Sequence, residues 1–397
     1  MNDVIKRRIK GLEGSLELFS KKIADMDLAG EGAAGISGAV FQEMKALGYD
    51  EVMKDKAGNL IGIIKGHEDR EDLVLISHMD PTVPGKESLV GFKAGIISSI
   101  YAGALLKRSM LPLKGDLVVC CVPRAECCGF GIKYLFGNYL KKRIGRVKGA
   151  LLCEPTDLNV HLGHKGRMEY EIVVKGRMDH DFLENKGINM LGTMFPLINE
   201  LEKVSHTLPS DCSLGASSLK IKDVSYNGCQ PSEQNREFRI VVDRNFIPEE
   251  DIQAILKRAK SIARSVYKGE TDIAVATSVS TSRFTTAAGL EVDSQKEFAP
   301  WRMEANHPLV GSALEVLTEN GFKSELGYWQ KIITEGSYIF GELKIPTVGF
   351  GVGREESVDS RSSSLTIAEL EKAVYGQALI AQRVIGIPTF GWSADEI

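Results

Sequence analysis

The segment DLVLISHMD, residues 72–80, decides the fold expected for this chain and locates its chemistry. Its apolar part, residues 73–76, is a short uninterrupted run of the kind that occupies a central strand covered on both faces. His78 and Asp80 follow directly, so the strand delivers an imidazole and a carboxylate to its carboxyl end. In an open α/β sheet, ligands bind outside the carboxyl ends of the strands. We therefore expect a site at this edge, with side chains suited to zinc.

Similar apolar runs alternate with segments of helical periodicity along much of the chain. The runs are residues 59–65, 72–77, 116–122, 149–153 and 345–351, and the helical segments are residues 40–47, 94–107, 130–141 and 367–384. Strands and helices that alternate in this way predict an α/β domain with a mostly parallel central sheet.

The middle of the chain has a different pattern. Residues 167–175 alternate apolar and charged side chains, as a strand with one exposed face does. A helix at 189–204, strands at 217–225 and 237–243, a helix at 249–266 and a strand at 271–279 complete a β-α-β-β-α-β series. We therefore predict a ferredoxin-like α+β domain at 166–285. It is inserted into a discontinuous α/β domain, residues 1–165 and 286–397, to which the chain returns through a helix near 308–320.

Composition limits the classes of partner. The 397-residue chain has 26% charged residues and a formal net charge of −4, which gives no electrostatic reason to expect nucleic acid or an anionic membrane. No apolar run approaches the roughly 18 to 20 residues of a membrane span, and the N-terminal residues lack the apolar stretch of a signal peptide. Seven cysteines, including two adjacent pairs, do not resemble a secreted disulfide framework. We expect a cytoplasmic protein with reduced thiols.

Other strand ends also carry polar side chains. Glu126, with Cys127 and Cys128, follows one predicted strand, Glu154 follows another, and Asp359 lies some way beyond the last. A carboxylate that binds no metal can serve as general base for metal-activated water. Each residue alone is more simply a loop residue, but several strand ends meeting at one edge favour a shared site.

These residues resemble a known family. HMDPTVP at 78–84, CEPT at 153–156, GHKGRMEYEIVVKG at 163–176 and IPTVGFGVG at 345–353 are similar to the zinc-dependent amidohydrolases and metallopeptidases that include acetylornithine deacetylase, succinyl-diaminopimelate desuccinylase and aminoacylase. Within that group the chain most resembles the branch labelled selenium-metabolism hydrolases. The resemblance implies a zinc-exopeptidase-like catalytic domain, an inserted ferredoxin-like lid that forms homodimers, and hydrolysis of amide bonds in N-acyl amino acids or small peptides.

Carried over by position, the resemblance retains part of a two-metal site. It implies that His78 and Glu154 bind the first metal and that Asp80 orients His78. The aspartate that bridges the two metals in the family is replaced here by Gly91, in LVGFKAG at 89–95. The loss of the bridge affects both metals, so we expect at most one zinc ion, bound by His78 and Glu154 and completed by Asp359 or a cysteine thiolate.

The paired glutamates of the family can be aligned in two registers. Counting back from Gly129 makes Glu126 the general base and puts Cys127 at a ligand position. Counting back from residues 131–135 instead puts Arg124 and Ala125 at the two positions, which leaves neither base nor ligand. The second register needs no gap and is preferred. Asp359 falls where the family has the C-terminal metal-binding histidine, and aspartate can also bind zinc.

Three further residues are assigned from the resemblance. His180 matches the lid histidine that in dimeric relatives polarises the scissile carbonyl in the partner's active site. Arg244 matches a ligand-binding position, and Gly336 lies in TEG at 334–336, which matches a turn of the cleft. The simpler alternatives are a solvated loop histidine and an arginine paired within the lid. His161 and His164 are interpreted as structural.

Two functions follow from this mixed site. The first is a family member with impaired or lost hydrolysis that acts as a binding or regulatory protein. The alternative is an active amidohydrolase with an altered mononuclear site built from His78, Glu154 and Asp359, with Glu126 as base. In both, the ligand is a small amino-acid derivative or peptide and the protein is a homodimer through the lid.

Overall fold

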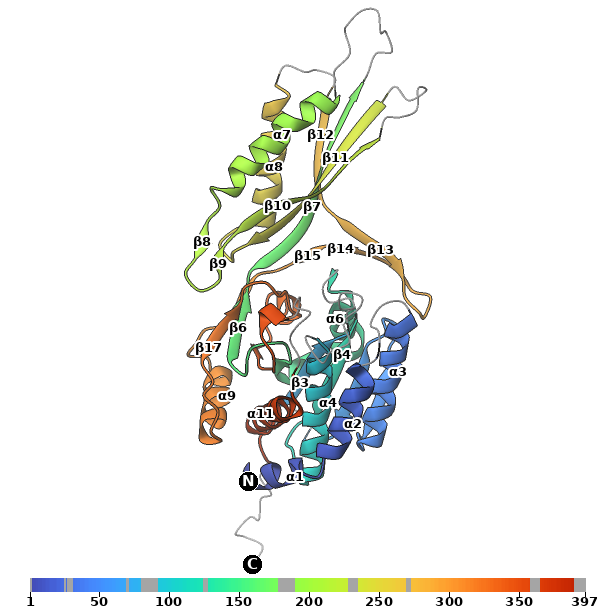
Figure 1. Cartoon of the computed structure of the whole chain (residues 1–397), viewed down its shortest axis with the longest axis vertical. Coiled ribbons are helices and arrows are strands. Elements are labelled where there is room, and N and C mark those ends of the chain that lie inside the picture. Colours follow the sequence, from blue (N-terminus) through green and yellow to red (C-terminus); the bar gives the residue numbers. More distant parts are fainter. Residues whose placement is uncertain are drawn as a thin grey trace, which may run out of the picture. The chain divides into compact units, whose positions relative to one another are not determined.

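The computed structural model describes residues 2–24, 26, 31–68, 71–79, 92–123, 128–177, 190–227, 235–268, 273–357 and 365–388. The chain divides into two compact units (Figure 1). The first comprises residues Met1–His164, Thr285–Val292 and Trp301–Ile397, and the second comprises Lys165–Phe284 and Asp293–Pro300.

The first unit contains a nine-stranded sheet in the order β1-β2-β4-β3-β5-β18-β6-β16, with β17 beside β6. Its strands are β1 (Glu51–Lys54), β2 (Leu60–Ile64), β3 (Asp72–His78), β4 (Leu117–Val122), β5 (Val147–Leu152), β6 (Val160–His164), β16 (Trp301–Arg302), β17 (Leu326–Trp329) and β18 (Thr347–Gly349). The central strands β4, β3, β5 and β18 are mutually parallel. The α/β prediction is confirmed, with antiparallel pairs added toward both edges.

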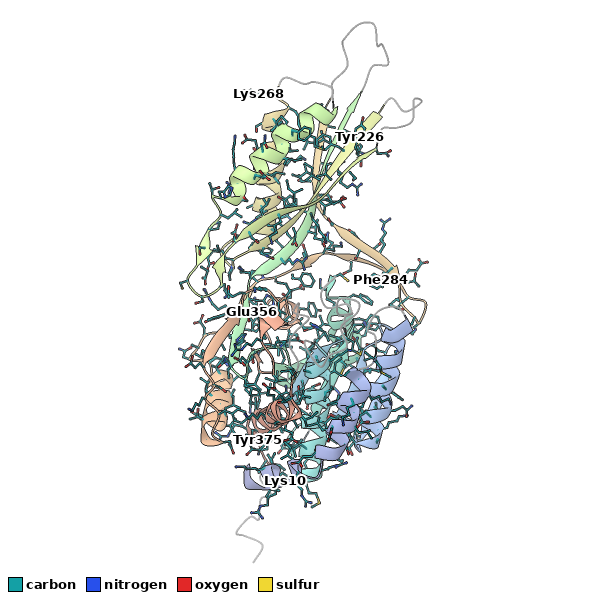
Figure 2. All side chains as sticks on the ribbon, in the orientation of Figure 1. Lys10, Tyr226, Lys268, Phe284, Glu356 and Tyr375 are labelled. Carbon is teal, nitrogen blue, oxygen red and sulfur yellow. The ribbon has the colours of Figure 1, made fainter. Side chains whose placement is uncertain are left out.

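Helices pack on this sheet and on one another because their apolar faces need a partner. They are α1 (Asn2–Ile9), α2 (Glu13–Ala24), α3 (Glu31–Ala46), α4 (Phe92–Ser109), α6 (Phe130–Tyr134), α9 (Pro308–Glu319), α10 (Gly336–Ile339) and α11 (Ile367–Ile385). The helices α4 and α11 pack together and contact β3. Tyr375 on α11, which is labelled in Figure 2, donates a hydrogen bond of 2.9 Å to Asn320 at the end of α9.

Two details differ from the sequence prediction. The single helix expected at 130–141 is divided into three short helices. These are α6, a π-helix at Leu135–Tyr139 and a 3-10 helix at Leu140–Lys142. Further 3-10 turns lie at Ile144–Arg146 and Glu355–Ser357. Residues 293–300 were assigned to the first domain, but they lie in the second unit, since β15 (Glu297–Phe298) pairs with β7 (Gly166–Arg177).

The second unit has the predicted ferredoxin-like order. Its elements are β7, α7 (Met190–Ser205), β8 (Ser210–Asp211), β9 (Gly215–Ala216), β10 (Ser218–Asn227), β11 (Asn235–Phe246), α8 (Ile252–Val266), β12 (Ile273–Val279) and β15. The main strands run in the order β10-β11-β7-β12, and each neighbouring pair is antiparallel. The hairpin of β13 (Thr281–Thr285) and β14 (Glu291–Gln295) is divided between the units, since residues Thr285–Val292 are assigned to the first. The sheet and its two helices enclose a second core, separate from that of the first unit.

Candidate metal centre

Two adjacent parallel strands bring His78 and Glu154 to the same level of the sheet. Ile76 on β3 is in register with Leu152 on β5, and each of the two polar residues follows its strand partner by two positions. The backbone N–H of Cys153 donates a hydrogen bond of 2.7 Å to the Ile76 carbonyl, which continues this pairing to the strand ends. The carboxyl edge therefore fixes one imidazole beside one carboxylate.

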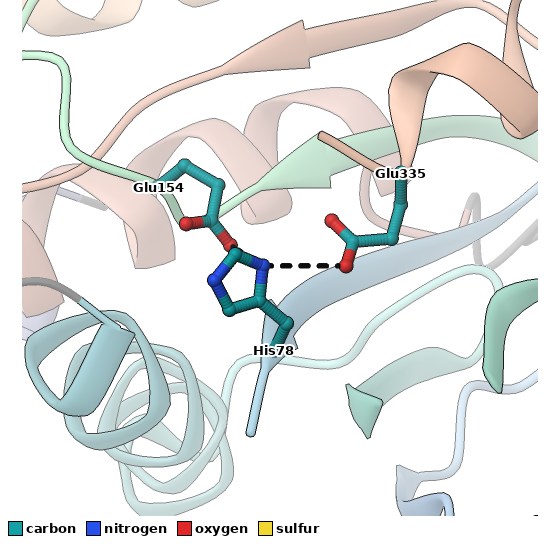
Figure 3. Close-up of side chains that lie close together, drawn as sticks. All are labelled: His78, Glu154 and Glu335. Carbon is teal, nitrogen blue, oxygen red and sulfur yellow. Dashed lines mark ion pairs between the residues drawn. The ribbon is translucent and has the colours of Figure 1, made fainter. Parts of the chain in front are cut away.

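Glu335 supplies a third side chain at the same point. It lies immediately before α10, as the residue that begins this short helix. His78 Nδ1 is 3.4 Å from Glu335 Oε1 and 3.5 Å from Glu154 Oε1. One ligand atom from each of the three residues lies within 4.8 Å of the others. Figure 3 shows these three side chains converging from separate segments of the first unit.

The electrostatics of this group favour a cation. The exposed fractions of His78, Glu154 and Glu335 are 0%, 1% and 3%, and the two carboxylates together carry a charge of −2 when both are ionised. Buried charges need a counter-charge or a metal, because removing them from water is costly. Within the described residues, neither Glu335 carboxylate oxygen accepts a hydrogen bond. The donor set of imidazole and carboxylates suits zinc, so the residues present fit the metal that the family resemblance implies.

A close backbone approach fixes the position of Glu154. Thr156 Oγ1 donates a hydrogen bond to the Gly351 carbonyl at 3.1 Å and accepts one from the Gly351 N–H at 3.0 Å. A Cβ atom on Gly351 would lie 2.3 Å from the carbonyl oxygen of Glu154. Glycine is therefore required at 351 for the segment after β18 to lie against the segment after β5.

Of the predicted metal ligands, the structure brings His78 and Glu154 together. Four of the other predicted site residues lie outside the described residues, namely Asp80, Glu126, His180 and Asp359, as do the alternative positions Gly91, Arg124, Ala125 and Cys127. Cys128 is described and fully buried, as a cysteine that packs as a small apolar core residue is.

Arg244 has clear structural partners in the second unit. The Arg244 guanidinium, 2% exposed, pairs with Glu250 and donates to the carbonyls of Ser218 and Asn245. Burial lowers the pKa of Arg244, and Glu250 opposes this effect. The partners of Arg244 thus lie within the second unit, and Asp243 pairs instead with Arg167 at 2.9 Å. The roles of Arg244 and Gly336 in ligand binding stay predictions.

Glu335 is the residue that the sequence analysis missed. It appeared there only as part of a turn, and the third ligand was expected to be Asp359 or a cysteine. The available signal was an acidic residue between two small polar or apolar neighbours in TEG at 334–336. That signal is weak, because the segment follows the short strand β17 and lies far from β3 in the sequence. Only the tertiary structure brings Glu335 close to His78 at the end of β3.

With this geometry in place, comparison with known proteins identifies the family. The model of Peptidase family M20/M25/M40 matches residues 74–383. The chain belongs to this family. The matched residues include parts of both units and all three residues of the candidate metal group, His78, Glu154 and Glu335.

Individual relatives in sequence and structure agree with this assignment. The chain is 26% identical to the uncharacterized protein YgeY of Escherichia coli strain K12, over 79% of this chain and 80% of that protein. It is 24% identical to the uncharacterized metallohydrolase MJ1497 of Methanocaldococcus jannaschii, over 82% of this chain and 86% of that one. The crystal structure of aminopeptidase PepT from Bacillus cereus superposes with a TM-score of 0.69 at 18% identity, covering 94% of this chain and 98% of PepT. This structural likeness shows the shared fold.

Proposed function

We propose that this M20 family member is a metal-dependent amidohydrolase that uses one divalent metal ion held by His78, Glu154 and Glu335. The observation that carries the proposal is the buried carboxylate of Glu335, 3.4 Å from the His78 imidazole. It raises the number of candidate protein ligands from two to three, which is the usual number in catalytic zinc sites. A bound zinc ion would polarise a substrate carbonyl and lower the pKa of a water molecule.

The chain's own residues would hold the ion and limit access of water to it. Glu154 and Glu335 provide the negative charge that retains a divalent cation, and their burial strengthens that attraction. Asp80 would orient His78, and Glu126 would accept the proton from the attacking water in the register that makes it the general base. His180 from a partner subunit's lid would polarise the scissile carbonyl.

The proposed substrates are N-acyl amino acids or small peptides. The family resemblance supports this class, and PepT is named an aminopeptidase. A ligand carboxylate would be recognised by basic or N–H groups, and the turn at Gly336 is the candidate in the first unit. Arg244, which pairs with Glu250 in the second unit, is a separate candidate from the family resemblance. We also propose, from the motifs at 153–156 and 163–176, that the chain belongs with the selenium-metabolism hydrolases within this family.

A second candidate function is binding or regulation without hydrolysis. It is favoured by Gly91, which stands where the family has the metal-bridging aspartate, and by the register that replaces the paired glutamates with Arg124 and Ala125. In that case a protonated His78 would neutralise part of the charge of Glu154 and Glu335 as a buried ion pair, and no metal would be needed.

Metal analysis separates the two functions. Protein purified without chelator and supplied with zinc is expected to hold about one zinc per chain after removal of excess ion, and His78→Ala is expected to hold none. A zinc content near zero in the unmodified protein, measured by atomic emission, would reject the mononuclear site and favour the binding protein.

Turnover provides the second test. A panel of N-acyl amino acids and dipeptides, supplied with zinc, manganese or cobalt, should be cleaved by the unmodified protein and not by Glu154→Ala. If both proteins show the same background rate on every compound while zinc still binds, the metal site has no hydrolytic role on this class of substrate.

A further inference from the structure

His164 holds the turn from which Glu335 projects. The backbone N–H of Thr334 donates a hydrogen bond of 2.9 Å to Nε2 of His164, and the Thr334 hydroxyl oxygen lies 3.0 Å from the same nitrogen. Because Nε2 accepts from a backbone N–H, the proton of the neutral ring is on Nδ1. This hydrogen bond fixes the backbone one residue before Glu335.

Two tryptophans fix the orientation of the His164 ring. His164 ends β6 and is in register with Trp301 on β16 and with Trp329 on β17. The ring meets both indoles edge-on, with centroids 5.7 Å and 6.3 Å apart. His164 is 1% exposed, so its ring is packed within the first unit.

Trp301 also contacts the other side of this turn. A Cβ atom on Gly336 would lie 2.3 Å from Trp301 Cε2, so the backbone after Glu335 packs directly on the indole. The Gly336 N–H also donates to Thr334 Oγ1 at 3.3 Å. Glu335 is therefore placed between a residue hydrogen-bonded to His164 on β6 and a residue packed on Trp301 of the partner strand β16.

We propose that His164 is a positioning residue for the metal centre, which sets the place of the third ligand by fixing Thr334. This inference rests on the proposed function, since it assumes that Glu335 binds the metal. Groups that orient metal ligands through hydrogen bonds typically change metal affinity 10- to 100-fold when they are removed. The flexible glutamate side chain needs such support, because loss of backbone position at a turn would spread its carboxylate over many places.

The test compares substitutions that separate the hydrogen bond from packing. His164→Phe keeps an aromatic ring but removes the acceptor. His164→Gln places an amide oxygen as far along the side chain as Nε2, whereas His164→Asn is one atom shorter. His161→Phe is the matched control, because His161 lies on the same strand and packs edge-on against Trp329 at 4.9 Å, while its Nδ1 has no hydrogen-bond partner within the described structure.

The measured quantity is the zinc dissociation constant at pH 7.5, obtained by competition with a chromophoric chelator, with thermal unfolding of the metal-free proteins as a separate measurement. We expect His164→Phe and His164→Asn to bind zinc about 10- to 100-fold more weakly. His164→Gln should restore most of the affinity, and His161→Phe should differ from the unmodified protein by less than about threefold.

Each outcome decides between explanations. If the His164 variants lose thermal stability but keep the zinc affinity of the unmodified protein, the residue is merely structural and the inference is overturned. Equal weakening in His161→Phe would also overturn it, because packing alone would then explain the effect. Absence of zinc binding in the unmodified protein would reject the proposed function itself, which is distinguishable from both. The pair His164→Gln and His164→Asn keeps the test decisive if His164→Phe does not fold.

Discussion

At the scale of single residues, Glu335 adds a third candidate metal ligand to His78 and Glu154. His78 and Glu154 alone would leave a metal ion with fewer protein ligands than catalytic zinc sites usually have. The third side chain, the carboxylate of Glu335, is buried, with an exposed fraction of 3%. Its effect on metal binding can be measured without knowledge of the substrate.

We predict that Glu335→Gln reduces zinc affinity by more than about 100-fold, because it removes a charged ligand rather than a supporting group. Isothermal titration with zinc is the measurement. Glu325→Gln makes the same change at an exposed position of the first unit and should leave affinity unaltered. Equal affinity of Glu335→Gln and the unmodified protein would remove Glu335 from the ligand set.

His161 makes the stability of the fold depend on pH. Burial lowers its pKa from 6.5 to about 4, so between these values the unfolded chain binds a proton that the folded protein does not. Stability therefore rises with pH through this window: the destabilising effect is absent above pH 6.5 and fully present below pH 4.

Substitution should remove this dependence. His161→Phe is expected to lessen the fall in unfolding free energy between pH 7 and pH 4.5 by roughly 1–3 kcal/mol, since each pKa unit corresponds to about 1.4 kcal/mol. Urea denaturation at several pH values measures the effect. Parallel pH profiles for the two proteins would show that His161 does not contribute.

At the scale of elements, α11 begins with a complete capping box. The Thr366 side chain accepts a hydrogen bond from the Glu369 N–H, and the Glu369 carboxylate accepts one from the Thr366 N–H. The hydrogen bonds that the Glu369 carboxylate accepts from the Thr366 N–H and from the Thr366 hydroxyl lower the pKa of Glu369. Because α11 packs against α4 and α9, its first turn supports the helical layer over the sheet.

We predict that Thr366→Ala lowers the unfolding free energy by about 1 kcal/mol, the usual cost of removing an N-cap side chain. Thr366→Ser keeps the acceptor oxygen and should lose much less. Chemical denaturation at pH 7 provides the comparison. A loss of the same size in both variants would mean that the threonine methyl group, rather than the cap, is responsible.

At the scale of the whole molecule, we predict a homodimer formed through the second unit. Its outer strand β10 is at one edge of the sheet and packs beside α7. Exposed apolar side chains occur on both elements: Phe195 on α7 is 62% exposed and Val224 on β10 is 36% exposed. Among the described residues β10 pairs with a strand on one side only, and an edge strand with apolar neighbours is suited to pairing with a second copy.

Phe195→Glu combined with Val224→Glu should therefore raise the dimer dissociation constant at least about tenfold, since buried charge opposes association. Sedimentation velocity at micromolar concentration is the measurement. Leu18→Glu alters a residue of the first unit that is 73% exposed and should have no effect. A monomeric unmodified protein would contradict the prediction.

Among the residues that the structure describes, no helix combines the length and apolar character needed to cross a bilayer. The division into two units assigns the whole candidate metal group to the first. Its ligand geometry is therefore set within one unit of the fold.

The sequence by itself determined the elements whose periodicity is strong. The apolar runs of β3, β4 and β5 predict buried parallel strands, and the alternation in β7 predicts an exposed sheet face. The strand ends then identify His78 and Glu154, because residues that follow neighbouring parallel strands meet at one edge. These predictions depend only on local pattern and on general rules of α/β sheets.

Only the tertiary structure decided the third ligand. The strand β6 and its partners β16 and β17 are too short and too mixed in composition to show a period, and they form because they pair with one another. Their pairing places His164 between two tryptophans and against Thr334. Glu335 reaches His78 through contacts between segments far apart in the chain, and such contacts leave no periodic pattern in the sequence.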